Sequence, residues 1–261
     1  MSRIAFTGER LVDGQELFGV DLARHRAAYA FAQEWARDRQ VVDLGCGTGY
    51  GSAELSDAGA RMVAVDRVPP DSAHRREGLG FVRADLSGVP FRAGSFDLVV
   101  SFQVLEHLED PAAYLDDLAL LLRPEGTALL TTPNLLQSER ENPFHVHEYE
   151  ARELETVLGR HFEAVEMRGI GASPAVARYH ADRLRRIRRI TRLDPLALRR
   201  RLPRAWVHWL FARFAVRVRR GIRQGQGLPS VDVGDFPVGP ADPECLDLLA
   251  VCRRPRVAPR P

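Results

Sequence analysis

Residues 41–51 read VVDLGCGTGYG, a short apolar run that ends at an acidic residue and passes into a glycine-rich segment. An apolar run of this length predicts a buried strand, and alternate glycines predict a tight turn whose backbone can approach a ligand closely. A helical pattern follows from Gly49 to Ala58. Because open α/β sheets bind ligands where such strands end, this stretch predicts both the fold and the site.

Outward from this turn, short apolar runs alternate with helical patterns. Helices are predicted over residues 21–37, 49–58, 111–122 and 149–158. Strands are predicted over residues 40–44, 61–66, 80–83, 96–102, 127–132, 162–167 and 246–252. This alternation is typical of βαβ units, so we expect an α/β fold with a mostly parallel sheet and helices on both faces.

A long segment, residues 169–243, interrupts the alternation. Within it, residues 178–223 carry many arginines but only two acidic residues, Asp182 and Asp194. Apolar residues also recur there at every fourth position: Trp206, Leu210, Phe214, Val218 and Ile222. These features predict a basic amphipathic helix. We therefore expect a lead and helix over the ligand site (1–39), a core (40–168), a basic helical insertion (169–243), and a closing strand and tail (244–261).

The role of this insertion stays open between four interpretations. It could be a lid whose arginines are solvated, a surface that rests on anionic lipid, a pocket for an anionic substrate, or a dimer interface. RNA binding is disfavoured, because Trp206 and Trp209 fall among apolar helix positions that packing explains.

The composition excludes several classes of protein and of chemistry. The chain has 261 residues, 45% of them hydrophobic and 28% charged, which is typical of a globular protein. All 37 basic residues are arginine, so no lysine is available for a Schiff base or a Walker loop. The three cysteines have no metal-ligand spacing, and no signal-peptide or membrane-spanning run is present. We expect a cytoplasmic enzyme, with a peripheral membrane location as the alternative.

Three aspartates lie at or just after the ends of the first three predicted strands: Asp43, Asp66 and Asp85. A carboxylate beside the glycine turn would repel a pyrophosphate but suits a ligand that carries an ammonium and a sulfonium, as S-adenosylmethionine does. A nicotinamide cofactor is also disfavoured, because Tyr50 or Ser52 stands where the third dinucleotide glycine should be. Asp66 can accept hydrogen bonds from ribose hydroxyls, and Asp85 from an adenine amino group. The aspartates therefore predict a site for S-adenosylmethionine.

Together these motifs resemble the class I S-adenosylmethionine-dependent methyltransferases, in particular the type 11 group that includes quinone-pathway and natural-product methyltransferases. The matching segments are residues 41–51, 65–66, 84–86, 90–91, 96–101, 104–108 and 123–126. The resemblance covers roughly residues 40–134. It implies a Rossmann-like seven-stranded sheet whose last strand is antiparallel, which places the arginine-rich insertion before that last strand.

The resemblance also implies which residues bind the cofactor. The candidates are Asp43, Gly45, Cys46, Gly47, Gly49, Asp66, Arg67, Asp85, Leu86 and Phe102. It puts Asp43 and the first glycines against the methionine moiety, Asp66 on the ribose, and Asp85 with the Leu86 backbone on the adenine. Arg67 and Phe102 would flank the adenine or the methionine tail. For Asp85, a turn-forming aspartate is the alternative.

Residues 142–149, NPFHVHEY, follow the fifth predicted strand and would lie over the place where an acceptor must sit. His145 and His147 are candidate general bases for a hydroxyl acceptor. With Glu148 they could also form a metal site, which the lack of further ligands nearby disfavours. In the other alternative, Glu148 caps the following helix. The resemblance makes residues 106–107, Glu-His, a common feature that shapes the site, with catalysis as the alternative.

These observations predict methyl transfer to a small-molecule acceptor or to a lipid- or saccharide-linked one. The histidines favour a hydroxyl oxygen over nitrogen or carbon as the methylated atom. A non-catalytic adenosylmethionine-binding module is one alternative, because a fold does not fix a function. The others are N- or C-methylation of a natural-product or RNA acceptor and, more distantly, a dehydrogenase.

Overall fold

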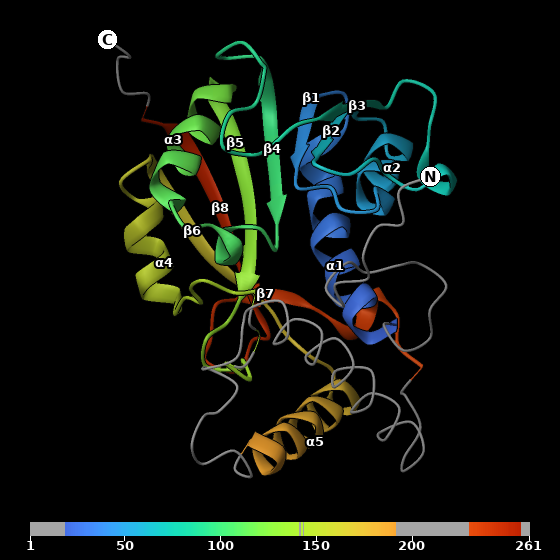
Figure 1. Cartoon of the computed structure of the whole chain (residues 1–261), viewed down its shortest axis with the longest axis vertical. Helices are drawn as coiled ribbons and strands as arrows, with labels where there is room; N and C mark the ends of the chain where they lie inside the picture. The colour runs from blue at the N-terminus through green and yellow to red at the C-terminus, as the bar shows by residue number, and fades with distance from the viewer. Residues whose placement is uncertain (1–18, 141, 143, 192–229, 257–261) are drawn as a thin grey trace, which may run out of the picture.

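The computed structural model describes residues 19–140, 142, 144–191 and 230–256. They form one eight-stranded sheet in the order β3-β2-β1-β4-β5-β8-β6-β7 (Figure 1). The strands are β1 Gln40–Leu44, β2 Arg61–Asp66, β3 Gly80–Arg83, β4 Phe96–Phe102, β5 Leu122–Pro133, β6 Phe162–Ile170, β7 Val238–Pro240 and β8 Asp247–Pro255. The first five strands are parallel, and β8 lies antiparallel between β5 and β6. The predicted α/β fold with a mostly parallel sheet is confirmed.

The predicted number of seven strands was too low. The additional strand, β7, pairs antiparallel with Arg168–Ile170 at the edge of the sheet. Its three residues are Val-Gly-Pro, which show no apolar alternation, and a proline is tolerated only because β7 is an edge strand. β6 also extends beyond residue 167, where the apolar pattern of the sequence ended, because Arg168–Ile170 pair with β8 on one side and with β7 on the other.

Helices cover both faces of the sheet. They are α1 Gly19–Ala36, α2 Tyr50–Asp57, α3 Pro111–Leu121, α4 Ala151–Leu158 and α5 Pro174–Thr191, with short 3₁₀ turns η2 Ser72–His74, η3 Leu105–His107 and η5 Val233–Asp235. Side chains alternate along β1, so that Val41 joins the core under α1 whereas Val42 joins the core under α3 and α4. Helix α1 and the pair α3 and α4 therefore pack on opposite faces of the same strands.

Helix α3 shows why its boundaries could be predicted closely. Asp110 is the N-cap, and its side chain accepts a hydrogen bond of 3.1 Å from Ala113 N. Pro111 occupies the first turn, where its missing N–H costs nothing. The buried side chains Leu115 and Leu118 then pack on the sheet, where they are fully enclosed.

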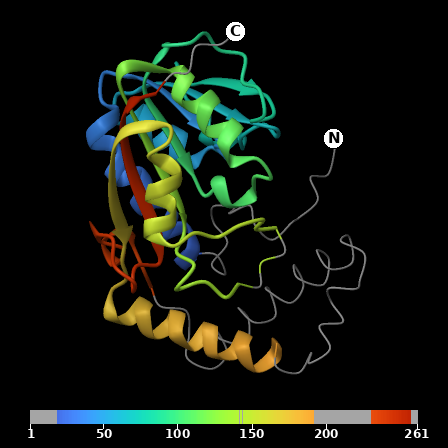
Figure 2. The ribbon, with the colours of Figure 1, turned by 90° about the vertical axis from the view of Figure 1, so that its left-hand side faces the viewer.

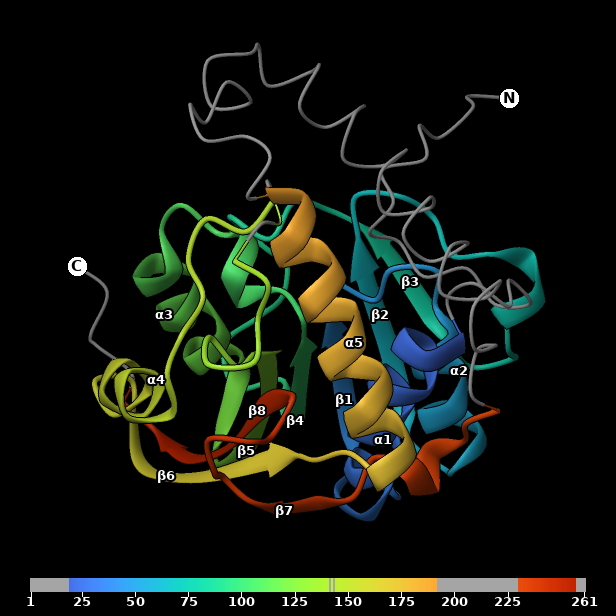
Figure 3. The same ribbon diagram turned by 90° about the horizontal axis from the view of Figure 1, so that it is seen from below.

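Helix α5 lies across the edge of the sheet where β4 and β5 end, below the sheet in Figures 1 and 2 and in front of it in Figure 3. Arg183 anchors the helix, since its guanidinium lies 3.3 Å from Asp21 on α1 and 3.2 Å from Glu139 after β5. His180 adds a 2.9 Å hydrogen bond to the carbonyl oxygen of Gln137. The amphipathic helix predicted around residues 206–222 lies outside the described residues. None of the described helices has the length and apolarity that crossing a membrane requires.

Candidate functional site

The glycine turn between β1 and α2 is built from residues with left-handed backbone angles. Gly45 and Gly49 have φ angles of 87° and 88°. A Cβ atom on Gly45 would lie 2.5 Å from Val104 Cγ2, and one on Gly49 would lie 2.6 Å from Pro70 Cβ. Both the backbone angle and the close packing therefore require glycine at these positions. The turn is held against the end of β2, because Gly45 N and Cys46 N both donate to Val65 O.

Asp43 is fully buried beneath α1. Its Oδ2 accepts hydrogen bonds from Ser52 Oγ at 2.6 Å and from Tyr29 Oη at 3.1 Å. Its Oδ1 is also buried but has no hydrogen-bond partner among the described residues. Burial raises the pKa of Asp43 to about 6, although the hydrogen bonds from Ser52 and Tyr29 oppose the rise. A buried carboxylate oxygen without a donor fits a ligand that brings a cationic donor of its own.

Asp66 links the glycine turn to the loop after β2. Its Oδ2 accepts a 3.0 Å hydrogen bond from Gly47 N, and its Oδ1 accepts a 2.9 Å bond from Val68 N. A carboxylate has about four lone-pair sites, so it can still accept from ligand hydroxyls. Asp66 therefore has a structural role in the turn, and its contact with a ribose stays a prediction.

Arg67 and Asp85 follow β2 and β3, and both side chains are largely exposed. Asp85 Oδ1 accepts a 3.1 Å hydrogen bond from Ser87 N. This is the contact of a turn-forming aspartate, the alternative given for this residue. That hydrogen bond, helped by Arg67, holds the pKa of Asp85 below its ordinary value. The Arg67 guanidinium is 3.7 Å from the Asp85 carboxylate.

Phe102 and Leu86 border the turn from two other elements. Phe102, at the end of β4, is 5% exposed and packs edge-on against the Tyr29 ring at 4.9 Å. Leu86 lies near Gly45, with its Cδ1 3.7 Å from the position of a Cβ there. The structure thus gathers the predicted cofactor residues around one turn. It also adds Tyr29 and Ser52, which the sequence argument missed because neither belongs to a recognisable motif.

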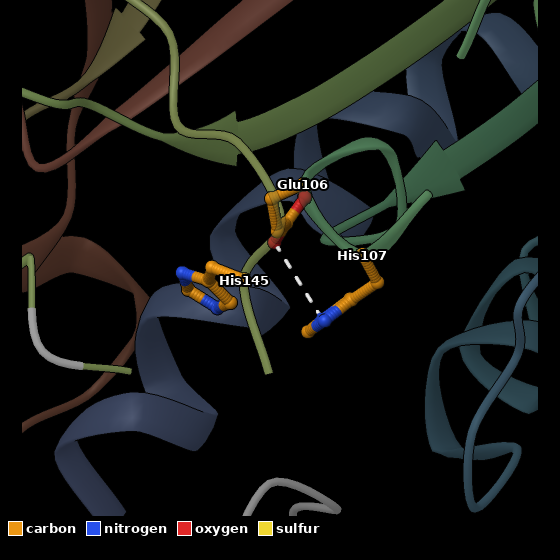
Figure 4. Close-up of side chains that lie close together, drawn as sticks. All are labelled: Glu106, His107 and His145. Atoms are coloured by element: carbon orange, nitrogen blue, oxygen red, sulfur yellow. Dashed lines mark ion pairs between the residues drawn. The ribbon is translucent and has the colours of Figure 1, made fainter. Parts of the chain in front are cut away.

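A second cluster, formed by Glu106, His107 and His145, joins η3 to the loop after β5 (Figure 4). One ligand-capable atom from each residue lies within 4.8 Å of the others. His107 Nε2 is 4.0 Å from Glu106 Oε1, and the two imidazole rings lie 5.0 Å apart in an edge-on arrangement. Val104 packs on Gly45 of the glycine turn, and Glu106 follows Val104 by only two residues. The Glu-His-His cluster therefore lies beside the glycine turn.

Glu106 is the fully buried member of the cluster. Its Oε2 accepts a 3.1 Å hydrogen bond from Thr132 Oγ1, whereas its Oε1 is buried with no hydrogen-bond partner in the described part of the chain. Burial raises the pKa of Glu106 to about 7, against the opposing attraction of His145. Its carbonyl oxygen accepts from Val146 N at 2.7 Å and from His147 N at 3.2 Å, which fixes the loop above η3.

The two histidines predicted as general bases do not come together. His145 lies in the cluster, with its ring nitrogens 2.6 Å from Glu148 Oε1 and 2.8 Å from Asn142 Nδ2. His147 is exposed and instead contacts Glu153 at 2.8 Å. Residues two apart in a regular strand share a face, but this segment bends at Val146, where Val146 N and His147 N both bind Glu106 O, so the two imidazoles reach different partners.

Among the described residues, His145, His147 and Glu148 do not gather as the alternative metal site requires. The helix cap predicted for Glu148 was wrong. Helix α4 has Glu150 at its N-cap, without a side-chain cap hydrogen bond. The Glu106-His107 pair after β4, predicted to shape the site, contributes two of the three clustered side chains.

Comparison with known proteins gives a consistent family. The family model for a methyltransferase domain matches residues 20–172, more than half of the chain. A probable S-adenosylmethionine-dependent methyltransferase of Mycobacterium tuberculosis is 31% identical over 191 residues, which cover 70% of this chain and 67% of that protein. A relative of the same description from Mycolicibacterium smegmatis is 33% identical, and the match spans 60% of this chain and 64% of that protein.

Two further similarities are shorter or more distant. A ubiquinone biosynthesis O-methyltransferase of Parvibaculum lavamentivorans is 36% identical over 104 residues, covering 37% of this chain and 41% of that protein. A crystal structure from Thermotoga maritima, described as an S-adenosylmethionine-dependent methyltransferase and possible histamine N-methyltransferase, has a TM-score of 0.57. It is 12% identical and covers 91% of this chain and 92% of that chain, so it supports the fold alone.

Proposed function

Because the chain belongs to the class I S-adenosylmethionine-dependent methyltransferases, we propose that it methylates a hydroxyl oxygen of a small-molecule, lipid-linked or saccharide-linked acceptor. The observation that carries the oxygen assignment is the Glu-His-His cluster beside the glycine turn. A hydroxyl is a weak nucleophile until its proton leaves, and histidine is the side chain best suited to take that proton near neutral pH. The similarity to an O-methyltransferase over 104 residues agrees with this proposal.

Asp43 and Asp66 are the residues that we propose to hold the cofactor. The unpartnered Oδ1 of Asp43 would accept from the ammonium of the methionine moiety, and Asp66 would accept from the ribose hydroxyls. Asp85 and the Leu86 backbone would contact the adenine, and Arg67 and Phe102 would flank the adenine or the methionine tail. Once bound, S-adenosylmethionine supplies an already activated methyl group, so the remaining work of the chain is placement and removal of the acceptor proton.

The hydrogen bonds of His107 define its tautomer. Its Nδ1 lies 3.0 Å from the carbonyl oxygen of Phe144, which can only accept, so Nδ1 carries the proton and donates. The Nε2 atom then bears the lone pair on the side of Glu106. His145 Nδ1 lies beside the Glu148 carboxylate, which would stabilise a proton on that imidazole. Either ring could therefore receive an acceptor proton.

His145→Ala is expected to lower kcat for methyl transfer about 100-fold, because general-base catalysis contributes roughly 10²–10⁴-fold. The measurement is incorporation of labelled methyl groups from S-adenosylmethionine into extracted small molecules and lipids, with calorimetric cofactor affinity recorded in parallel. His147→Ala is the matched control, since its ring contacts Glu153 outside the cluster. Equal activity of the two variants would contradict a general base at His145. Release of S-adenosylhomocysteine by the wild-type protein separately excludes a non-catalytic binding module.

Cofactor binding is expected to weaken as the pH falls below about 6, where the Asp43 carboxyl takes up a proton and loses its attraction for an ammonium. The bound cation favours the charged carboxylate, so affinity rises with pH through that region and then levels off, with a limiting slope of about tenfold per pH unit. Calorimetric titrations between pH 4.5 and 8 measure this profile. Asp43→Asn should flatten it, and an unchanged profile in that variant would assign the titration elsewhere.

The membrane contact predicted for residues 178–223 remains a proposal, because most of this segment lies outside the described residues. Its described part, on α5, exposes Arg178, Arg185, Arg188 and Arg189. Such a basic surface at the carboxyl edge of the sheet would suit an acidic headgroup or an acidic acceptor.

A further inference from the structure

We propose that Glu106, His107 and His145 bind a divalent transition-metal ion. Three protein ligands leave at least one coordination position of the ion open toward the acceptor. The three side chains point toward one another at the carboxyl edge of the sheet (Figure 4), with their ligand-capable atoms within 4.8 Å. Only the ion's role in the reaction rests on the proposed function. Its binding to the chain does not.

The strongest structural argument is the unsatisfied oxygen of Glu106. The carboxylate is enclosed, Oε2 is used by Thr132, and Oε1 has no hydrogen-bond partner among the described residues. Leaving a carboxylate oxygen buried and unsatisfied costs several kcal/mol unless a cation or a donor compensates it. The atom that faces this oxygen is His107 Nε2, 4.0 Å away, so a cation between them would satisfy both.

Both histidines are oriented as metal ligands usually are. His107 donates from Nδ1 to the Phe144 carbonyl at 3.0 Å, and His145 has Nδ1 2.6 Å from the Glu148 carboxylate. Metal-binding histidines commonly donate one ring N–H to a carbonyl or carboxylate, which fixes the ring, and bind the ion through the other nitrogen. Asn142 Nδ2 now lies 2.8 Å from His145 Nε2, so metal binding would displace that hydrogen bond.

The donor set selects the class of ion. Two imidazole nitrogens and one carboxylate oxygen suit Zn²⁺, Mn²⁺, Fe²⁺ or Co²⁺, whereas Mg²⁺ and Ca²⁺ prefer oxygen ligands. Tetrahedral Zn²⁺ with bonds of about 2.0–2.1 Å needs ligand atoms about 3.3 Å apart. The cluster therefore has to contract by somewhat more than 1 Å, a change that side-chain rotation in the loop bearing His145 can supply.

Three protein ligands with an open position form the arrangement of a catalytic rather than a structural zinc site. An acceptor hydroxyl that enters the open position would lose its proton to solvent at a lower pH. Its oxygen would then attack the methyl carbon while the carbon–sulfur electron pair returns to sulfur, giving the methyl ether and S-adenosylhomocysteine. The ion thus supplies the deprotonation that a histidine base would otherwise supply.

The test is metal binding by the full chain, with any affinity tag removed and resident metal stripped with a chelator. We expect Co²⁺ to bind with one ion per chain and a visible absorption band, and Zn²⁺ to displace it, with stoichiometry read by elemental analysis. Glu106→Gln and His145→Asn should each weaken Co²⁺ binding at least tenfold. His147→Ala should leave it within twofold, and circular dichroism verifies that each variant is folded.

Binding of less than one ion, or binding that survives both cluster substitutions, would overturn the metal site. Methyl transfer by the stripped protein is measured separately. If it persists while no ion binds, the metal proposal fails and oxygen methylation stands. If one ion binds at the cluster but no hydroxyl acceptor is methylated in extracts, the metal site stands and the proposed reaction fails.

Discussion

Asp66→Ala is expected to bind S-adenosylmethionine about 30-fold more weakly than wild type. Asp66 accepts backbone hydrogen bonds from Gly47 and Val68, and we propose that it also accepts from the ribose hydroxyls. Hydrogen bonds to a charged group contribute roughly 1.5–3 kcal/mol each, so losing one to the ligand accounts for about 2 kcal/mol of binding. Isothermal titration calorimetry with S-adenosylmethionine and S-adenosylhomocysteine measures the change directly.

Asp85→Ala is the matched control for this prediction. It removes an aspartate at the end of the next strand whose side chain is exposed and already bonded to Ser87 N. A solvent-exposed carboxylate gains less from a ligand hydrogen bond, so we expect at most about a fivefold loss. Unchanged affinity in Asp66→Ala would remove that residue from the binding site. A larger loss in Asp85→Ala would move the main nucleoside contact to β3.

The strands and the glycine turn could be predicted because their determinants are local. Apolar runs located six of the eight strands closely, and the glycines marked the turn that Gly45 and Gly49 form with left-handed angles. The other two strands, β5 and β7, depend on pairing with neighbouring strands. β7 exists only through its pairing with β6, and β5 begins at Leu122, before the apolar run that predicted it.

The chemistry of the site depended more strongly on contacts distant in sequence. Asp43 and Asp66 end adjacent strands, so strand order alone places them at one edge. Glu106 and His145 come from two different connections, and they meet because Val146 N and His147 N bind the Glu106 carbonyl. No spacing rule in the sequence predicts which histidine of an H-x-H segment such a pairing turns inward.

Gly51→Ala is expected to lower the free energy of unfolding by about 2 kcal/mol, although alanine normally stabilises a helix interior relative to glycine by about 1 kcal/mol. Gly51 lies in α2, outside the left-handed part of the turn. A Cβ atom there would lie 2.1 Å from Cζ of Tyr29, a buried residue of α1. Chemical denaturation followed by circular dichroism measures the loss, with Gly19→Ala as control because nothing lies within 4 Å of its Cβ position.

A double-mutant cycle with Tyr29→Ala identifies the ring as the cause. In the Tyr29→Ala background the space above α2 is open, so Gly51→Ala should cost nothing or stabilise, and the two changes should be strongly non-additive. Additive effects would show that the cost arises within α2. Tyr29 also donates to Asp43, so a ring displaced by Gly51→Ala should weaken S-adenosylmethionine binding in the folded variant. That coupling would make α1 part of the cofactor site through one side chain, a role that its own apolar pattern does not reveal.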